Sequence, residues 1–232
     1  MHSVRHIFFD LDRTLWDFET NSQNTLRELF DELDLAEQLG VASTTFIKEY
    51  KRINEIYWND YRDGVITKEE LRHARFEATM QYFGHDDPGL AARFGELYIE
   101  RSPHRTALVD GAIELLDHLS PNYALHIITN GFSEVQHIKM SESGLAPYFR
   151  QVIISEEVGY KKPHRKVFRF AENATGSVPG NSLMIGDHFE ADITGALNAG
   201  WKAVFFEPDG MGTKKRDGFV QVSSLPEIMR LL

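Results

Sequence analysis

The chain has 232 residues, a formal net charge of −10 and 42% apolar residues. This composition supplies enough apolar surface for a substantial core, which excludes a disordered protein, and the acidic balance argues against binding long nucleic acids through their phosphates. The lack of cysteine excludes disulfides and thiolate metal sites, and no apolar run reaches the roughly 20 residues of a membrane span. We therefore expect a soluble, cytoplasmic protein whose partners are neither nucleic acid polymers nor membranes, with its oligomeric state left open.

The first predicted strand, VRHIFF at residues 4–9, runs directly into Asp10 and Asp12. Alternate residues of a strand point to the same side, so these two carboxylates would share one small volume. Like charges that lie this close repel each other and are costly to desolvate. The pattern therefore predicts a compensating cation that the rest of the chain has to supply or bind.

The segment from residue 17 to residue 103 has apolar residues at helical spacing and contains no predicted strand. Examples of this spacing are Leu26, Leu29, Phe30 and Leu33. Thr67 and Glu70 predict a capping box at the start of one of the helices. We expect an all-helical insertion over residues 17–103, with residues 1–16 and 104–232 forming the rest of the fold.

Four further short apolar runs have the character of buried strands, and most are followed by a helical pattern. The runs are ALHIIT at 124–129, QVIIS at 151–155, SLMIG at 182–186 and KAVFF at 202–206. The predicted helices cover residues 132–140, 166–171 and 191–199. Alternating strands and helices indicate an α/β fold with a parallel sheet and helices on both of its faces. The later DGMGTKK segment lacks the further glycine and the helix of a phosphate cradle, and we expect it to be a loop.

Polar side chains follow four of the predicted strands at the point where each strand ends. They are Asp10, Asp12 and Thr14, then Thr129 and Asn130 before Gly131, then Lys161 and Lys162, and finally Asp187 and Asp192. In open parallel sheets, ligands bind outside the carboxyl ends of the strands. These residues are therefore expected to gather at one edge of the sheet, where they offer groups for a phosphate and for a metal ion.

The acidic residues of this set predict a magnesium site. The carboxylates of Asp10 and Asp187, together with the backbone carbonyl of Asp12, are the hard oxygen ligands that octahedral Mg²⁺ prefers. Charge counting agrees, because the negative charge of these carboxylates and of a phosphate ester is larger than the single positive charge of Lys162 can balance. Asp192 is placed to orient Lys162 or a metal-bound water rather than to bind the metal directly.

The same residues predict phosphoryl transfer. Asp10 attacks phosphorus and forms an aspartyl-phosphate, while Asp12 first donates a proton to the leaving oxygen and then takes one from water. Thr129, Asn130 and Lys162 are expected to bind the phosphate oxygens. Each motif is weak by itself, since a lone T-N-G is most often a turn in which glycine tolerates a positive φ. The ordered set on the strand ends carries the prediction.

Four segments of the chain resemble the motifs of the haloacid dehalogenase-like hydrolases, and the resemblance spans nearly the whole sequence. FFDLDRTLWDF, TNGFSEVQHIKMSESGLAPYF and SEEVGYKKPHRKVF are similar, more narrowly, to the pyrimidine 5′-nucleotidases of that group, which act on noncanonical nucleotides. The resemblance implies a Rossmann-like core, with the helical insertion forming a cap domain of the superfamily's first type. It also implies Asp10 as the nucleophile, Asp12 as acid and base, Thr129 and Lys162 on phosphate, and Asp187 on Mg²⁺.

Two positions depart from the pattern of these relatives. Arg13 stands where many of them have glycine, which bears on the shape of the turn after the nucleophile. His188 stands where many of them carry a small polar or acidic residue, which bears on the surroundings of the metal.

Substrate choice is expected to depend on the cap domain, which would close over the site and exclude water. Trp16 and Phe18 follow the first motif and are candidates to wall the entrance. Trp58 and Tyr61 share one face of a predicted helix, where they either stack on a base or pack against the other domain.

Together, the residues and the resemblance predict a Mg²⁺-dependent phosphomonoester hydrolase, a 5′-nucleotidase for pyrimidine nucleoside monophosphates. A phosphatase for a small sugar phosphate or phosphoglycolate, or a sugar-phosphate mutase, would use the same core. The alternative of another class is a non-catalytic phosphate-binding module, against which the joint presence of Asp10, Asp12, Lys162 and Asp187 argues. Haloacid dehalogenation is disfavoured because it needs neither Mg²⁺ nor an acid at Asp12.

Overall fold

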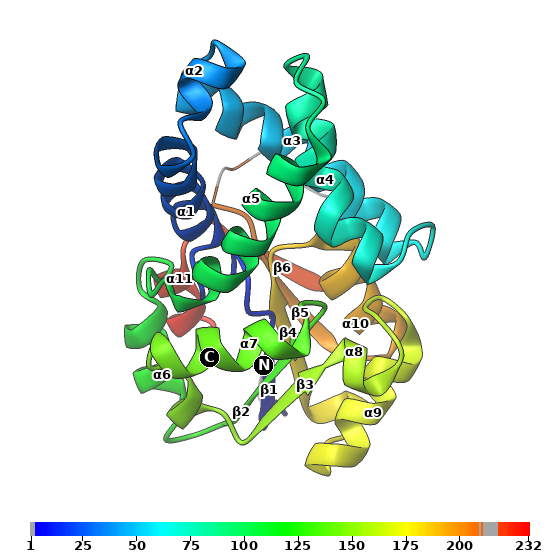
Figure 1. The fold of residues 1–232 in the computed structure, drawn as a ribbon. Coiled ribbons are helices and arrows are strands. Elements are labelled where there is room, and N and C mark those ends of the chain that lie inside the picture. The colour runs from blue at the N-terminus through cyan, green and yellow to red at the C-terminus, as the bar shows by residue number, and fades with distance from the viewer. Residues whose placement is uncertain (1–2, 209, 211–217) are drawn as a thin grey trace. The chain divides into compact units, whose positions relative to one another are not determined.

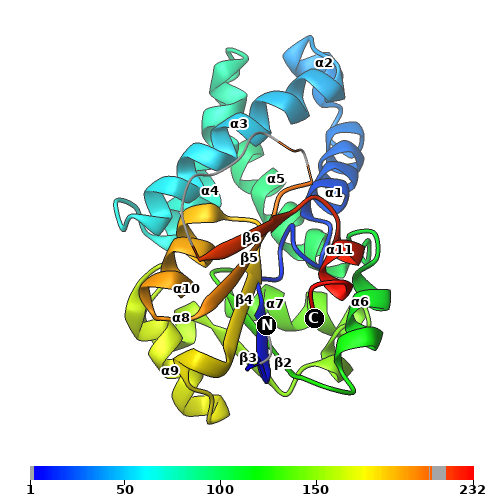
Figure 2. The same cartoon turned by 180° about the vertical axis from the view of Figure 1, so that it is seen from behind.

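The computed structural model describes residues 3–208, 210 and 218–232. Among these residues, six parallel strands form one sheet in the order β3-β2-β1-β4-β5-β6. The strands are β1 His6–Phe9, β2 Ala124–Thr129, β3 Gln151–Ile154, β4 Ser182–Gly186, β5 Lys202–Phe206 and β6 Phe219–Val222. Figures 1 and 2 show the sheet from opposite sides. The predicted α/β fold with a parallel sheet is confirmed.

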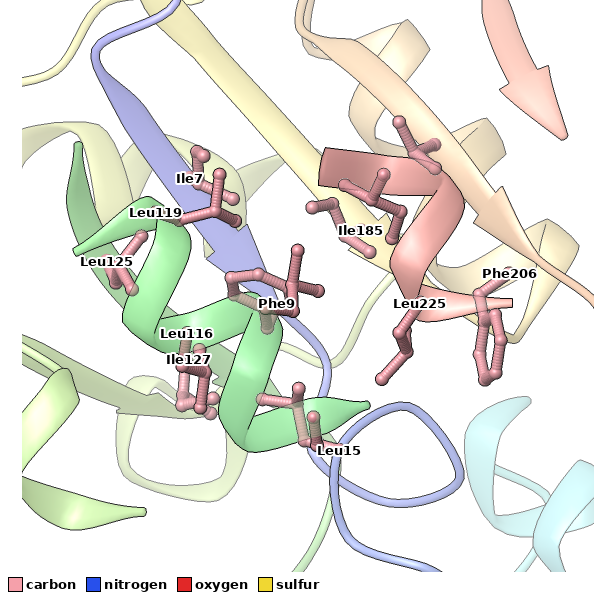
Figure 3. Packing of buried hydrophobic residues seen from close by; sticks show 14 of the residues in the cluster. Ile7, Phe9, Leu15, Leu116, Leu119, Leu125, Ile127, Ile185, Phe206 and Leu225 are labelled. Atoms are coloured by element: carbon pink, nitrogen blue, oxygen red, sulfur yellow. The ribbon is translucent and has the colours of Figure 1, made fainter. Parts of the chain in front are cut away.

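Each central strand presents alternate side chains to opposite faces of the sheet, and both faces are buried. In β1, Ile7 and Phe9 belong to one hydrophobic cluster and Phe8 to another. Figure 3 shows the first cluster, in which Phe9 lies among side chains of neighbouring strands and of the helices that carry Leu116 and Leu225. Burial on both faces explains why the strands have continuous apolar runs rather than an alternating pattern.

Helices cover both faces of the sheet, as Figure 1 shows. The cluster with Ile7 and Phe9 includes residues of α6 Ala112–Leu119, α7 Ser133–Glu142 and α11 Leu225–Met229. The cluster with Phe8 includes residues of α9 Arg165–Thr175, the π-helix η4 Phe189–Thr194 and α10 Gly195–Asn198. The short elements are η2 Ala146–Tyr148, α8 Ser155–Val158 and η3 Pro179–Asn181. The predicted alternation of strands and helices is therefore present.

The chain divides into two compact units, one made of Met1–Phe18 and Thr106–Leu232 and the other of Glu19–Arg105. The second unit is helical throughout. Its elements are α1 Phe18–Glu32, α2 Leu35–Leu39, α3 Ser43–Arg62, α4 Lys68–Tyr82, α5 Pro88–Arg101 and η1 Ser102–His104. It has a core of its own, in which Phe46, Phe76 and Phe94 pack together.

The start of α4 carries the predicted capping box. The Glu70 backbone N–H donates to Thr67 Oγ1 at 3.2 Å, and the Thr67 backbone N–H donates to the Glu70 carboxylate at 2.7 Å. The first N–H groups of a helix lack partners within the helix, so this exchange satisfies donors that would otherwise be exposed. The helix consequently begins at Lys68, where the sequence places it.

One strand was not expected from the sequence. β6 pairs in parallel with β5 at the edge of the sheet. Only its last residue, Val222, is buried, and its sequence FVQV contains no continuous apolar run that would predict a strand. The DGMGTKK segment lies, apart from Gly210, outside the described residues. Within the described residues, no helix combines the length and apolarity needed to cross a membrane.

Candidate active site

The site forms where β1 and its two neighbours end. Asp10 follows β1, and its backbone N–H donates to the Ile185 carbonyl of β4 at 2.9 Å, which extends the ladder beyond the strand. Thr129 is the last residue of β2, on the other side of β1. Asp187 follows the last residue of β4. Because parallel strands end at the same edge of a sheet, residues far apart in the sequence meet here.

Lys162 is a buried cation that joins two carboxylates. Its side chain is 2% exposed, and its Nζ lies 2.5 Å from Asp10 Oδ1 and 2.7 Å from Asp192 Oδ1. Nζ also donates to the Ile128 carbonyl of β2 at 2.7 Å. Burial alone would lower the pKa of Lys162, but the two carboxylates outweigh burial and raise it, so the lysine stays charged. A fixed positive charge therefore lies beside Asp10.

Asp10, Asp187 and Asp192 form an acidic group whose candidate ligand atoms lie within 4.8 Å of one another. Burial raises the pKa of Asp10 to about 7; the Lys162 ammonium acts against this rise, and Asp192 adds to it. Burial also raises the pKa of Asp187 well above its usual value, and the carboxylates of Asp10 and Asp192 raise it further. One lysine leaves this group short of positive charge. Carboxylate oxygens at this spacing, one of them fully buried, fit a hard divalent cation such as Mg²⁺.

Asp192 is fully buried and is held at the start of η4. The His188 backbone N–H donates to its Oδ2 at 3.0 Å. A Cβ on Gly186 would lie 2.3 Å from the same oxygen, so the close approach of Asp192 to the end of β4 requires glycine there. The Ala191 backbone N–H donates to the His188 ring Nδ1 at 3.1 Å, which caps η4. These contacts fix the carboxylate of Asp192, whose Oδ1 contacts Lys162 Nζ.

The carboxylate of Asp12 binds helix α7. Lys139 Nζ donates to Asp12 Oδ1 at 2.6 Å, and Gln136 Nε2 donates to Asp12 Oδ2 at 2.9 Å. Both partners are buried, Gln136 completely. Our reading of the sequence missed these two residues. The available signal was their spacing, since residues at i and i+3 of a helix lie on one face.

The residues of the T-N-G segment make separate contacts. Thr129 Oγ1 accepts hydrogen bonds from the Gly131 backbone N–H at 3.0 Å and from Gln136 Nε2 at 2.7 Å. Asn130 donates from Nδ2 to the Lys162 carbonyl at 3.0 Å and accepts the Lys162 N–H at Oδ1 at 2.8 Å. The side chain of Asn130 thus holds the backbone of Lys162. Its expected contact with phosphate stays a prediction, because only one of the two Nδ2 hydrogens is used here.

The turn after Asp12 holds Arg13 in the left-handed region, with φ 64°. The next residue, Thr14, donates from Oγ1 to Asp187 Oδ1 at 3.1 Å, which links the turn to the end of β4. The guanidinium of Arg13 lies 4.9 Å from the centroid of the Phe18 ring. Arg13 therefore keeps a backbone conformation that glycine adopts without strain.

The aromatic residues expected near the substrate lie in different surroundings. Trp16 is fully buried in the core of the larger unit, so its ring is not exposed to wall an entrance, and Phe18 packs against the same core. In the smaller unit, Trp58 and Tyr61 meet edge to face with centroids 5.7 Å apart, and Tyr61 is buried. Stacking of either residue on a base stays a prediction.

Comparison with known proteins gives a family and two close relatives. The chain matches the haloacid dehalogenase-like hydrolases over residues 4–200. It is 36% identical to the pyrimidine 5′-nucleotidase YjjG of Escherichia coli, with 97% of this chain and 96% of that protein covered. It is 34% identical to the pyrimidine 5′-nucleotidase PynA of Streptococcus pneumoniae, with 88% of this chain and 84% of that protein covered.

A solved structure is similar over the whole chain. The HAD-hydrolase YfnB of Bacillus subtilis, bound to magnesium, gives a TM-score of 0.87 at 28% identity and 98% coverage of both chains. The family match covers most of this sequence, and the two nucleotidases exceed 30% identity over most of their own length. The chain therefore belongs to the haloacid dehalogenase-like hydrolases.

Proposed function

We propose that this protein hydrolyses phosphomonoesters through an aspartyl-phosphate intermediate and that its substrates are pyrimidine nucleoside 5′-monophosphates. The observation that carries the proposal is the contact between Lys162 and Asp10, 2.5 Å long and buried at the end of β1. A carboxylate held beside a fixed cation is placed to attack an anionic phosphate group, because the cation offsets their mutual repulsion. The similarity to YjjG and PynA supports the pyrimidine nucleotide as substrate.

The proposed reaction has two steps. First, a carboxylate oxygen of Asp10 bonds to phosphorus, the bond from phosphorus to the leaving nucleoside oxygen breaks, and Asp12 gives that oxygen a proton. Then a water gives its proton to Asp12 and attacks the phosphorus, which releases inorganic phosphate and restores Asp10. The positive charge of Lys162 and the hydroxyl of Thr129 stabilise the phosphoryl oxygens in both steps.

A divalent metal fits the acidic group described above. Asp10 and Asp187, with the backbone carbonyl of Asp12, would hold Mg²⁺, which when bound supplies positive charge to the transferring phosphoryl group. The raised pKa values of the two carboxyl groups reflect their burial and their like-charged neighbours, which a bound cation offsets. The magnesium bound by YfnB supports this assignment.

We further infer that the helical insertion, expected over residues 17–103, acts as a cap domain that selects the substrate. Its separate helical core supports an independent role, because substrate choice can then change without changes in the sheet. Trp58 is the candidate for stacking on the base, since its partner Tyr61 is buried.

The Asp10→Asn variant tests the mechanism. It removes the nucleophile while keeping the size of the side chain, so turnover of uridine 5′-monophosphate should fall by at least about 10³-fold. The measurement is phosphate release, with folding checked by circular dichroism. Asp110→Asn is the matched control, because Asp110 is exposed in the same unit and should leave turnover unchanged. EDTA should remove wild-type activity, and added Mg²⁺ should restore it.

The same assay on a panel of phosphomonoesters distinguishes the candidate functions. A preference for pyrimidine nucleotides supports the nucleotidase, whereas a preference for phosphoglycolate or a small sugar phosphate would replace it with the corresponding phosphatase. Hydrolysis that persists in a folded Asp10→Asn variant would rule out the aspartyl-phosphate mechanism.

A further inference from the structure

We propose that Gln136 and Lys139, on one face of α7, are positioning residues that fix the Asp12 carboxyl group and the Thr129 hydroxyl group for phosphoryl transfer. The inference rests on the proposed function, in which Asp12 is the proton donor and Thr129 binds phosphate. It assigns a catalytic task to a helix that carries no reacting group.

Lys139 is held rigidly where it meets Asp12. Its side chain is 9% exposed, its Nζ lies 2.6 Å from Asp12 Oδ1, and the same Nζ lies 4.3 Å from the centroid of the Trp16 ring. Burying an ammonium group is costly unless it is paired, and a carboxylate on one side with an indole face on the other provides this pairing. The ammonium group of Lys139 is therefore held in place by contacts within the protein rather than left free to move in solvent.

Gln136 holds the second oxygen of the same carboxylate. Its Nε2 donates to Asp12 Oδ2 at 2.9 Å, while Lys139 holds Oδ1. Rotation of the Asp12 carboxyl group about its own axis would break both contacts. The two residues of α7 thus define the plane in which Asp12 presents its carboxyl group.

Gln136 also defines the direction of the Thr129 hydroxyl. Thr129 Oγ1 accepts hydrogen bonds from Gln136 Nε2 and from the Gly131 backbone N–H, which occupy the two acceptor positions of a hydroxyl oxygen. Its one hydrogen is therefore left to be donated, which is the role needed toward a phosphate oxygen. One amide group in this way sets both the proton donor and a phosphate-binding hydroxyl.

Gly131 makes this arrangement possible. A Cβ at that position would lie 2.2 Å from Gln136 Nε2, so any other residue would push the amide away from Thr129. The backbone of Gly131 does not have a positive φ, so the conformational freedom of glycine does not explain why glycine is needed at this position. Glycine is required in the T-N-G segment because the Gln136 amide lies against its Cα.

The test compares two substrates with different leaving groups in Lys139→Met. The nucleoside of uridine 5′-monophosphate needs a proton from Asp12 to leave, whereas p-nitrophenyl phosphate releases a stable phenolate that needs little help. Loss of positioning should therefore lower kcat/KM for uridine 5′-monophosphate by ~10- to 100-fold and for p-nitrophenyl phosphate by less than ~5-fold. Lys139→Arg should recover most of the loss, because it restores a cation beside Asp12.

Lys166→Met is the matched control. Lys166 is exposed on α9, lies 4.3 Å from the centroid of the Tyr160 ring and donates to the Tyr160 hydroxyl at 2.6 Å, so it repeats the lysine–aromatic contact without a carboxylate. Both substrates should be hydrolysed at wild-type rates. If Lys139→Met does not fold, Gln136→Met is measured instead. Because Gln136 contacts Thr129 as well as Asp12, both substrates should then lose kcat/KM, with the larger loss on uridine 5′-monophosphate.

Three outcomes are distinct. A loss confined to the nucleotide substrate supports the proposal. An equal loss on both substrates, or wild-type kcat/KM in a folded Lys139→Met protein, overturns it and leaves the proposed phosphatase intact. Failure of the proposed function itself would be seen separately, as a wild-type protein that hydrolyses neither substrate.

Discussion

At the scale of single residues, Arg13 and His188 depart from the family pattern, yet the turn and the helix start that contain them have well-defined geometry. Arg13 retains a positive φ of 64°, although a Cβ in this region costs roughly 1–2 kcal/mol. His188 caps η4 through its ring Nδ1, which accepts the Ala191 N–H as a small polar side chain would. Both substitutions are therefore compatible with the geometry around Asp187.

A pair of substitutions at Arg13 isolates the backbone strain. Arg13→Gly and Arg13→Ala both remove the guanidinium from the Phe18 ring. They differ in the cost of a Cβ at positive φ and in the smaller, opposing entropy cost of ordering glycine. We expect the glycine variant to be more stable by about 1 kcal/mol in urea denaturation. The same pair at the exposed Arg169, inside α9, should show the opposite order, since glycine is unfavourable there. A glycine variant at Arg13 that is no more stable than the alanine variant would contradict the expected strain.

At the scale of elements, two histidines link neighbouring strands. His6 of β1 and His126 of β2 stack with centroids 5.4 Å apart, and His6 Nδ1 lies 3.2 Å from His126 Nε2. His126 Nδ1 is buried and has no hydrogen-bond partner within the described part of the chain. The tautomer of lowest free energy has no hydrogen on Nδ1 of His126 and donates its Nε2–H to His6. A buried donor without a partner costs more free energy than a buried acceptor without one. Both rings are then neutral in the folded protein.

Acid should destabilise the protein through this pair. Burial, with smaller contributions from His6 and Arg150, lowers the pKa of His126 from 6.5 to about 4. Between these values the unfolded chain binds more protons than the folded one, so the unfolding free energy falls as pH falls from 6.5 toward 4. The measurement is urea denaturation at pH 7 and at pH 5. Between these two pH values, the unfolding free energy of His126→Gln should fall by about 1–2 kcal/mol less than that of the wild type.

The exposed His118 on α6 provides the control for that measurement. His118→Gln should keep the wild-type dependence on pH. A dependence that is the same in the wild type and in His126→Gln would contradict the assignment to His126.

The sequence predicts strand ends better than helix faces. Asp10, Asp187 and Lys162 could be placed together because every parallel strand ends at the same edge, whatever the details of packing. The spacing of Gln136 and Lys139 puts them on one face of a helix, but it does not show that this face meets Asp12. That direction is decided by packing against Trp16 and Gly131. The fold was predictable for a similar reason. β6 was missed because three of its four residues are only half-buried, so it needs no continuous apolar run.

At the scale of the whole molecule, the two units have separate hydrophobic cores. The clusters on the two faces of the sheet contain no residue from Glu19–Arg105 among the described residues, and the third cluster lies entirely within that unit. Cooperative unfolding follows shared buried surface, so each unit is expected to respond mainly to changes in its own core.

Phe94→Ala tests this separation. Phe94 is fully buried between Phe46 and Phe76, so its truncation should cost about 3–5 kcal/mol within the smaller unit. Hydrogen exchange should show faster exchange in peptides of residues 19–105 and little change in β1 and β4. Phe168→Ala, at a fully buried position of α9 in the cluster with Phe8, should give the reverse pattern. Equal acceleration everywhere in both variants would show one cooperative unit.

The strand order has a consequence for synthesis on the ribosome. β1 is made first yet lies between β2 and β4, and the partner of Asp10 in the site, Lys162, is separated from it by 152 positions. Until β4 emerges, a nascent chain therefore presents one side of the apolar HIFF strand without a neighbour, and such edges invite aggregation. The interval before translation reaches β4 is when this polypeptide should depend most on chaperones.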